Sequence, residues 1–154
     1  MSRSEVFIDS SVFIGLLLGD ENAKELIKKA LNEGCTLVTN PIVFSETVYK
    51  VMFTLALRNG LKGIHDLRKH LKDYTHVYGK VEEAFEKLEE AGFLRITEVT
   101  QETIRIASQV GRDYKLLPND ALIAASCKEN GIERIATFDS DFKRVPFLKI
   151  FGVD

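Results

Sequence analysis

Short apolar runs alternate along the chain with longer segments whose apolar residues recur at helical spacing. The runs with the length and composition of strands are residues 6–8, 36–39, 93–97, 135–138 and 147–151. The segments with helical periodicity are residues 20–31, 41–59, 61–73, 80–91, 100–110 and 120–129. Strands that alternate with helices are typical of an α/β fold. We therefore expect a three-layer α/β/α architecture with a mainly parallel central sheet.

Local signals mark some of the helix ends. Asn40 followed by Pro41 predicts an N-cap with proline at the first helical position, and Asn59-Gly60 predicts the C-terminal end of that helix. The two helices expected within residues 61–91 are interpreted as an insertion attached to the same core. No repeat, low-complexity tract or Gly/Ser/Pro linker interrupts the pattern, so a single domain is expected over residues 1–154.

Composition and charge narrow the functional classes. The 154 residues are 45% hydrophobic and 29% charged, as in an ordinary globular protein, and the net charge is −2. This balance argues against a broad basic surface for nucleic acid, so any such contact would be local. Cys35 and Cys127 lie far apart in sequence without a zinc-like spacing and are expected to be buried, reduced thiols.

The chain shows no targeting or membrane signal. Its polar first residues lead straight into a strand without the apolar region of a signal peptide. The most apolar stretch, residues 41–57, is interrupted by Glu46 and Lys50 and is short for a bilayer. We expect a cytoplasmic protein that does not contact membranes.

Acidic residues follow the predicted strands. Asp9 comes directly after residues 6–8, and Asp139 follows 135–138, with Asp141 two residues further on. Asp120 opens a helix after a proline turn, and Glu46 lies in the apolar helix that follows the second strand. Because ligands bind at the carboxyl ends of parallel strands, these carboxylates are expected to share one crevice.

Each acid also has a purely structural interpretation. An aspartate at a strand-to-helix junction is often a helix cap or a partner of the helix dipole. Glu46 is less easily explained in this way, because burial of an unpaired carboxylate among apolar neighbours is costly, although an exposed stripe of that helix would accommodate it. Together, the carboxylates would repel one another unless a cation compensates them. A hard divalent ion such as Mg²⁺ suits oxygen ligands and can activate water for hydrolysis.

At this point the sequence resembles a known family. The segments that carry the resemblance are FIDSSVFI (residues 7–14), Ser45-Glu46, NDALIAA (119–125) and ATFDSDF (136–142). In order and spacing they resemble the motifs of the PIN-domain family, especially the VapC-type toxin ribonucleases of toxin–antitoxin modules. The similarity spans nearly the whole chain.

The resemblance implies a parallel sheet flanked by helices and endonucleolytic cleavage of RNA that depends on Mg²⁺ or Mn²⁺. It would make Asp9, Glu46, Asp120 and Asp139 the metal-binding and catalytic acids, with Thr137 as a supporting hydroxyl residue. Asp141 matches a less uniform position of the family. Ser11 stands where asparagine or a small polar residue is common, and residues 61–91 are longer than in the most compact members.

Substrate and partner contacts are expected outside the acids. Residues 58–80 carry six basic residues (Arg58, Lys62, Arg68, Lys69, Lys72 and Lys80) against Asp66 and Asp73, interleaved with Tyr74 and Tyr78. This stretch either holds an RNA backbone and stacks a base or is a solvated helix face. The helix at 41–57 has apolar residues on several sides, which favours a homodimer interface. The family adds a possible antitoxin segment in a hydrophobic groove.

Two other functional classes compete with a nuclease. A phosphotransferase with an aspartyl nucleophile would need a second acid two residues after Asp9, where Ser11 stands, and no glycine-rich phosphate loop is present. The stronger rival is a degenerate PIN domain that only binds RNA or protein. The presence of all four acids disfavours it.

Overall fold

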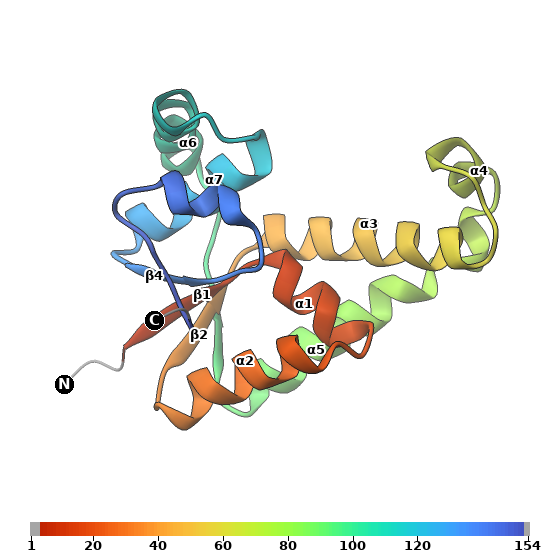
Figure 1. Cartoon of the computed structure of the whole chain (residues 1–154), viewed down its shortest axis with the longest axis horizontal. Coiled ribbons are helices and arrows are strands. Elements are labelled where there is room, and N and C mark those ends of the chain that lie inside the picture. The colour runs from red at the N-terminus through yellow and green to blue at the C-terminus, as the bar shows by residue number, and fades with distance from the viewer. Residues whose placement is uncertain (1–3, 153–154) are drawn as a thin grey trace.

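A five-stranded parallel sheet forms the middle of the molecule (Figure 1). The computed structural model describes residues 4–152. The strands are β1 (Glu5–Ile8), β2 (Thr36–Thr39), β3 (Leu94–Ile96), β4 (Arg134–Ala136) and β5 (Lys149–Ile150), in the spatial order β3-β2-β1-β4-β5. In the central strand β1, Phe7 pairs with Val38 on one side and with Ile135 on the other. The predicted architecture is confirmed, and every strand pair in the described sheet is parallel.

Helices cover both faces of this sheet. One layer contains α1 (Ser10–Leu17), α2 (Glu21–Asn32), α3 (Pro41–Arg58) and α5 (His76–Glu90), and the other contains α6 (Gln101–Tyr114) and α7 (Pro118–Glu129) (Figure 1). Burial on both faces explains why the central strand β1 is a nearly continuous apolar run instead of an alternating one. Val6, Phe7 and Ile8 are all fully buried.

The sequence signals at the start of α3 are confirmed. The Asn40 side chain caps the helix by accepting the Val43 backbone N–H at 3.0 Å, and Pro41 occupies the first turn. The helix ends at Arg58, as the Asn59-Gly60 pair predicts. The Asn40 amide also donates to the Ser126 hydroxyl at 2.8 Å, which connects the start of α3 to α7.

Helix α1 was not predicted. Its sequence, Ser10–Leu17, is apolar on nearly all sides after two serines, so it lacks the periodic polar face by which an exposed helix is identified. Val12 and Phe13 are fully buried beneath the neighbouring helices. Several other boundaries differ by a few residues: α6 runs on to Tyr114, and α7 begins at Pro118 and not at Asp120.

The predicted helix at 61–73 is wrong in its extent. It is divided into α4 (Ile64–Lys69) and a 3₁₀ turn, η1 (Leu71–Asp73), and the helix expected from residue 80 already begins at His76. Gly79 lies inside α5, so this glycine does not mark the helix start that its propensity suggests.

Only part of the 61–91 segment stands away from the core. α3 extends beyond the sheet and α4 lies at its far end, whereas α5 returns along α3 to β3 (Figure 1). Phe85 of α5 is buried, with its ring centroid 4.6 Å from that of Phe13 in α1. α5 therefore belongs to the helical layer, and the projecting tip is formed by α4 and η1.

Much of the apolar surface of α3 is buried within the chain. Val43, Val48, Val51 and Met52 are buried, while Tyr49 and Leu57 remain about half exposed. Within residues 4–152, no helix is both long enough and apolar enough to cross a bilayer. Both cysteines are buried and unpaired, as expected.

Candidate metal centre

The predicted acids gather at the carboxyl edge of the sheet. Asp9 follows β1 directly, Asp139 lies three residues after the end of β4, Glu46 lies in the second turn of α3, and Asp120 lies in the first turn of α7. Next to them is a pocket of about 430 Å³. Its walls are Glu46, Lys50, Leu117, Pro118, Asn119, Asp120, Asp139 and Asp141. The parallel topology therefore brings residues from distant parts of the sequence to one pocket.

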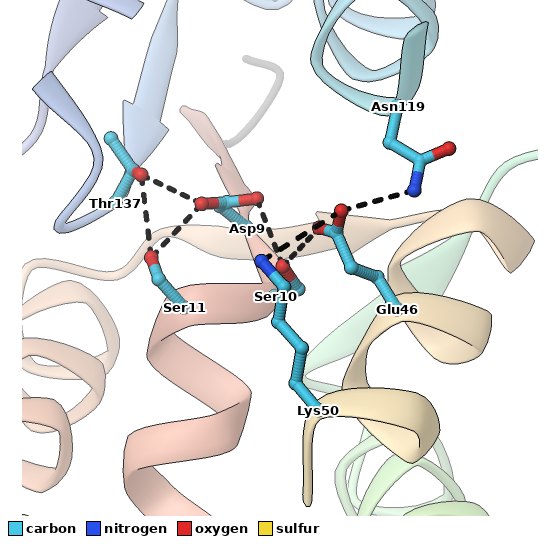
Figure 2. Close-up of polar contacts among 7 residues, drawn as sticks. All are labelled: Asp9, Ser10, Ser11, Glu46, Lys50, Asn119 and Thr137. Atoms are coloured by element: carbon cyan, nitrogen blue, oxygen red, sulfur yellow. Dashed lines mark hydrogen bonds and ion pairs between the residues drawn. The ribbon is translucent and has the colours of Figure 1, made fainter. Parts of the chain in front are cut away.

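Asp9 is held by hydroxyl groups of neighbouring side chains (Figure 2). Its Oδ2 accepts hydrogen bonds from the Thr137 hydroxyl at 2.7 Å and from the Ser11 hydroxyl at 2.9 Å. Burial raises the pKa of Asp9, these two hydroxyl groups lower it, and the nearby Glu46 carboxylate raises it. The hydroxyls therefore stabilise the charged form of a carboxylate that burial disfavours.

The same hydroxyl groups fix the loop after β4. The Thr137 hydroxyl accepts the Asp139 backbone N–H at 2.9 Å, and the Ser11 hydroxyl accepts the Phe138 backbone N–H at 3.0 Å. Each hydroxyl thus joins the Asp9 carboxylate to the backbone that carries Asp139. The supporting positions predicted for Thr137 and Ser11 lie in direct contact with Asp9.

Glu46 is largely buried and has polar partners on both carboxylate oxygens (Figure 2). The Ser10 hydroxyl donates to its Oε1, and the Asn119 side-chain amide donates to its Oε2 at 3.1 Å. The ammonium group of Lys50 is 4.0 Å from the same Oε2. Sequence reasoning assigned no role to Ser10, Asn119 or Lys50. Only the proximity of the first two to Asp9 and Asp120 in sequence pointed to them.

Asp120 lies where several carboxylates meet. Carboxylate oxygens of Asp120, Asp139 and Asp141 all lie within 4.8 Å of one another. The pKa of Asp120 is raised to about 7, first by burial and then by the negative charges of Asp139, Asp9, Glu46 and Asp141. A neutral-range pKa for an aspartate is the result expected when the carboxyl group is buried and other negative charges lie close to it.

Asp141 is held between the acids and a neighbouring loop. Its backbone N–H donates to Asp139 Oδ1 at 2.9 Å, and its own Oδ1 accepts from Arg144 at 3.0 Å. Arg144 also donates to the backbone carbonyls of Tyr114 and Lys115, at 3.0 and 2.8 Å. The guanidinium therefore ties the 3₁₀ helix η2 (Ser140–Arg144), which carries Asp141, to the C-terminal end of α6.

These donors suit a divalent cation. The pocket offers carboxylate oxygens, which are the ligands that Mg²⁺ and Mn²⁺ take in proteins. Within residues 4–152, Asp120, Asp139 and Asp141 form the group of possible ligands close enough to share one ion, and Asp9 and Glu46 add negative charge beside it. Burial and the surrounding negative charges both raise the pKa of Asp120, so a positive charge here would favour its ionised form.

Of the two tyrosines in the basic stretch at residues 58–80, Tyr74 is excluded as a base-stacking residue. Tyr74 is buried, and its hydroxyl accepts the Asn59 side-chain amide at 3.0 Å, so its ring cannot stack on a base. Tyr78 is about half exposed. The basic stretch begins at Arg58, about 18 Å along α3 from Glu46 by helical rise, and contributes no residue to the walls of the acidic pocket.

Known proteins resemble this chain over nearly its whole length. The family model of the PIN domain matches residues 6–148. Ribonuclease VapC6 of Methanocaldococcus jannaschii is 48% identical, over 97% of this chain and 98% of that protein. Ribonuclease VapC2 of the same organism is 35% identical, over 99% of this chain and 97% of that protein.

Solved structures share the fold at lower identity. The toxin VapC20 of Mycobacterium tuberculosis matches with a TM-score of 0.63 and 20% identity, over 93% of this chain and 96% of that one. A toxin–antitoxin complex from Klebsiella pneumoniae matches with a TM-score of 0.61 and 18% identity, over 94% and 95% of the two chains. The architecture, the order of the acidic motifs and these matches agree, and the chain belongs to the PIN domain family.

Proposed function

We propose that this protein is a metal-dependent endoribonuclease whose acids are Asp9, Glu46, Asp120 and Asp139, with Asp141 beside them. The observation that carries the proposal is the convergence of four carboxylates, Glu46, Asp120, Asp139 and Asp141, in the walls of one pocket, with Asp9 close to them. Burial, and then the negative charges of these neighbours, raise the pKa of Asp120 to about 7. A site of this kind suits a divalent cation and, through it, a phosphodiester. The relatives that are 48% and 35% identical over nearly the whole chain are named ribonucleases, which supports RNA as the substrate.

The roles of the individual residues follow from their contacts. Asp120, Asp139 and Asp141 would hold Mg²⁺ or Mn²⁺, with Asp9 and Glu46 completing the negative field. A bound ion supplies activation of water and neutralisation of phosphate charge. Thr137 and Ser11 favour the ionised form of Asp9 against the effect of its burial and align its carboxylate, and Ser10 and Asn119 orient Glu46. No nucleophilic side chain is required for such a hydrolysis.

We further propose that the protein is the toxin of a toxin–antitoxin pair and forms a homodimer. Structural neighbours that cover more than nine-tenths of this chain come from toxin–antitoxin complexes, which supports an antitoxin partner. An apolar groove of about 370 Å³ between α3, α4 and α5 offers exposed surface for a second chain. The half-exposed residues at this groove are Tyr49, Ile64, Leu71 and Tyr78.

The decisive experiment is RNA cleavage with Mg²⁺, with Mn²⁺ and with EDTA. Parent protein, Asp120→Asn and Asp113→Asn are prepared in parallel. Asp113 is an exposed aspartate on α6 that bonds to Gln109, so its variant controls for the loss of one carboxylate and for contaminating nucleases. We expect metal-dependent cleavage by the parent and by Asp113→Asn, and background cleavage by Asp120→Asn.

Other outcomes would redirect the assignment. Equal cleavage by all three proteins would mean that the activity is a contaminant or does not use Asp120. No cleavage of transfer, ribosomal or messenger RNA by the parent, at any metal concentration, would favour the degenerate PIN domain that only binds.

A further inference from the structure

The acidic pocket contains one basic side chain in its walls. Among the residues that line it in the described part of the chain, Lys50 is the single lysine or arginine. Arg144 contacts Asp141 from outside and is already engaged by that carboxylate and two backbone carbonyls. Lys50 is therefore the cation that a ligand entering the pocket would meet.

Lys50 is weakly held by its present partner. Its ammonium lies 4.0 Å from Glu46 Oε2, the limit of an ion pair, and its side chain is 54% exposed. The same Oε2 already accepts the Asn119 amide at 3.1 Å. The side chain is thus free to turn toward a stronger anion.

The surroundings explain why a cation is needed here. The four carboxylates in the pocket walls would repel an RNA backbone. A divalent ion bound among them would weaken the attraction between Glu46 and Lys50. A lysine ammonium is a compact point charge that binds phosphate oxygens well. Because Lys50 lies one helical turn beyond Glu46, it can reach a phosphate at the mouth of the pocket while Glu46 stays inside.

We propose that Lys50 binds a backbone phosphate of the RNA at the mouth of this pocket and so positions the chain for cleavage. This inference rests on the proposed ribonuclease function and adds to it a substrate-contacting residue. It places a basic contact in the wall of the acidic pocket, outside the basic stretch at residues 58–80 that the sequence suggested.

The test compares Lys50→Met, Lys50→Arg and Lys87→Met. Lys87 forms the equivalent ion pair with Glu83, four residues earlier on α5, but it does not line the pocket, so its variant is a matched control. RNA affinity is measured by fluorescence anisotropy of a labelled single-stranded oligonucleotide at several KCl concentrations. The proteins carry Asp120→Asn in this measurement so that the RNA stays intact. Mn²⁺ affinity and steady-state kinetics are measured with Asp120 present.

We expect Lys50→Met to weaken RNA binding by roughly tenfold and to reduce the slope of log K against log salt by about 0.7, the value for one phosphate contact on a single strand. KM should rise more than kcat falls, Mn²⁺ affinity should not fall, and Lys50→Arg should restore most of the binding. Lys87→Met should behave like the parent.

The contrary results are distinct. RNA binding by Lys50→Met equal to that of Lys87→Met, with an active parent, would overturn the role of Lys50 and leave the ribonuclease assignment intact. A parallel loss of Mn²⁺ affinity would show that Lys50 acts through Glu46 and not on RNA. A parent that neither binds nor cleaves RNA would remove both proposals.

Discussion

Two hydroxyl side chains join the Asp9 carboxylate to the loop that follows β4. Thr137 and Ser11 each donate to Asp9 Oδ2 and each accept a backbone N–H, from Asp139 and Phe138 respectively. Hydrogen bonds to the charged form of a buried carboxylate favour ionisation and fix its orientation. Each hydroxyl therefore holds the Asp9 carboxylate and, at the same time, the backbone at or next to Asp139.

Replacing Thr137 should separate its hydrogen bonds to Asp9 and to the Asp139 backbone from its contribution to packing. Thr137→Val keeps the shape but leaves Asp9 with one hydroxyl donor fewer and the Asp139 N–H without its acceptor. Loss of such a supporting partner typically lowers metal affinity about 10–100-fold. We expect this loss in Mn²⁺ binding by calorimetry, and we expect Thr137→Ser to retain most of the affinity.

Thr97→Val is the matched control for that experiment. Thr97 is also buried and donates its hydroxyl to a backbone carbonyl, that of Thr39, but it does not contact the acids. Its variant should bind Mn²⁺ like the parent even if its stability falls by about 1 kcal/mol. Equal losses of metal affinity in Thr97→Val and Thr137→Val would refute the specific role of Thr137.

The sequence was informative about the acids and much less so about their partners. Asp9 and Asp139 follow buried strands, so the parallel topology alone predicts that they share one edge of the sheet. The contacts of Glu46 with Ser10 and Asn119 depend on the packing of α1, α3 and α7, which no local pattern encodes. The burial of Tyr74 was not predictable for the same reason, because it depends on the packing of the helical tip and not on the basic residues near it in sequence.

At the scale of elements, α3 shows what a helix with many apolar residues does and does not reveal about its burial partners. Its excess of apolar residues predicted a second burial partner, and α1, α5 and α7 within the chain supply part of it. Tyr49 and Leu57 remain 47% exposed, and Tyr49 lines the groove shared with α4 and α5. The pattern thus identified the correct helix but did not distinguish intramolecular burial from an interface.

A charge in this groove should disrupt the proposed homodimer. We expect the parent to be a dimer by light scattering at micromolar concentration and Tyr49→Glu to be a monomer of nearly unchanged thermal stability, because the side chain is half exposed in the single chain. Ile104→Glu replaces a more exposed apolar residue on α6, away from the groove, and should leave the dimer intact. A monomeric parent, or identical behaviour of both variants, would exclude α3 as the dimer interface.

At the scale of the whole molecule, the sheet order determines where charge accumulates. Placing β1 between β2 and β4 brings the loops after three strands, together with the first turns of α3 and α7, to one edge. The fold thereby concentrates carboxylates that would be distant in an unfolded chain. Their repulsion is a cost of folding that grows as the carboxylates ionise.

This cost predicts how the stability of the metal-free protein depends on pH. The pKa of Asp120 rises on folding from its ordinary value of 3.8 to about 7. Between these values the folded chain keeps a proton that the unfolded chain releases, so raising the pH lowers the free energy of unfolding, and the loss is complete above pH 7. Asp120→Asn removes this titration. At ~1.4 kcal/mol per pKa unit, the free energy of unfolding of the variant, relative to that of the parent, should increase by about 2–3 kcal/mol from pH 5 to pH 8.

The measurement is urea unfolding in EDTA at both pH values, repeated with Mn²⁺. Asp113→Asn, which removes an exposed carboxylate, should differ from the parent equally at pH 5 and pH 8. Mn²⁺ should stabilise the parent strongly at pH 8 and weakly at pH 5, because protons and metal compete for the same carboxylates. If the stability difference between Asp120→Asn and the parent stays constant with pH, the pKa of Asp120 is not raised in the folded protein. The same stabilisation by Mn²⁺ in parent and variant would then place the ion elsewhere.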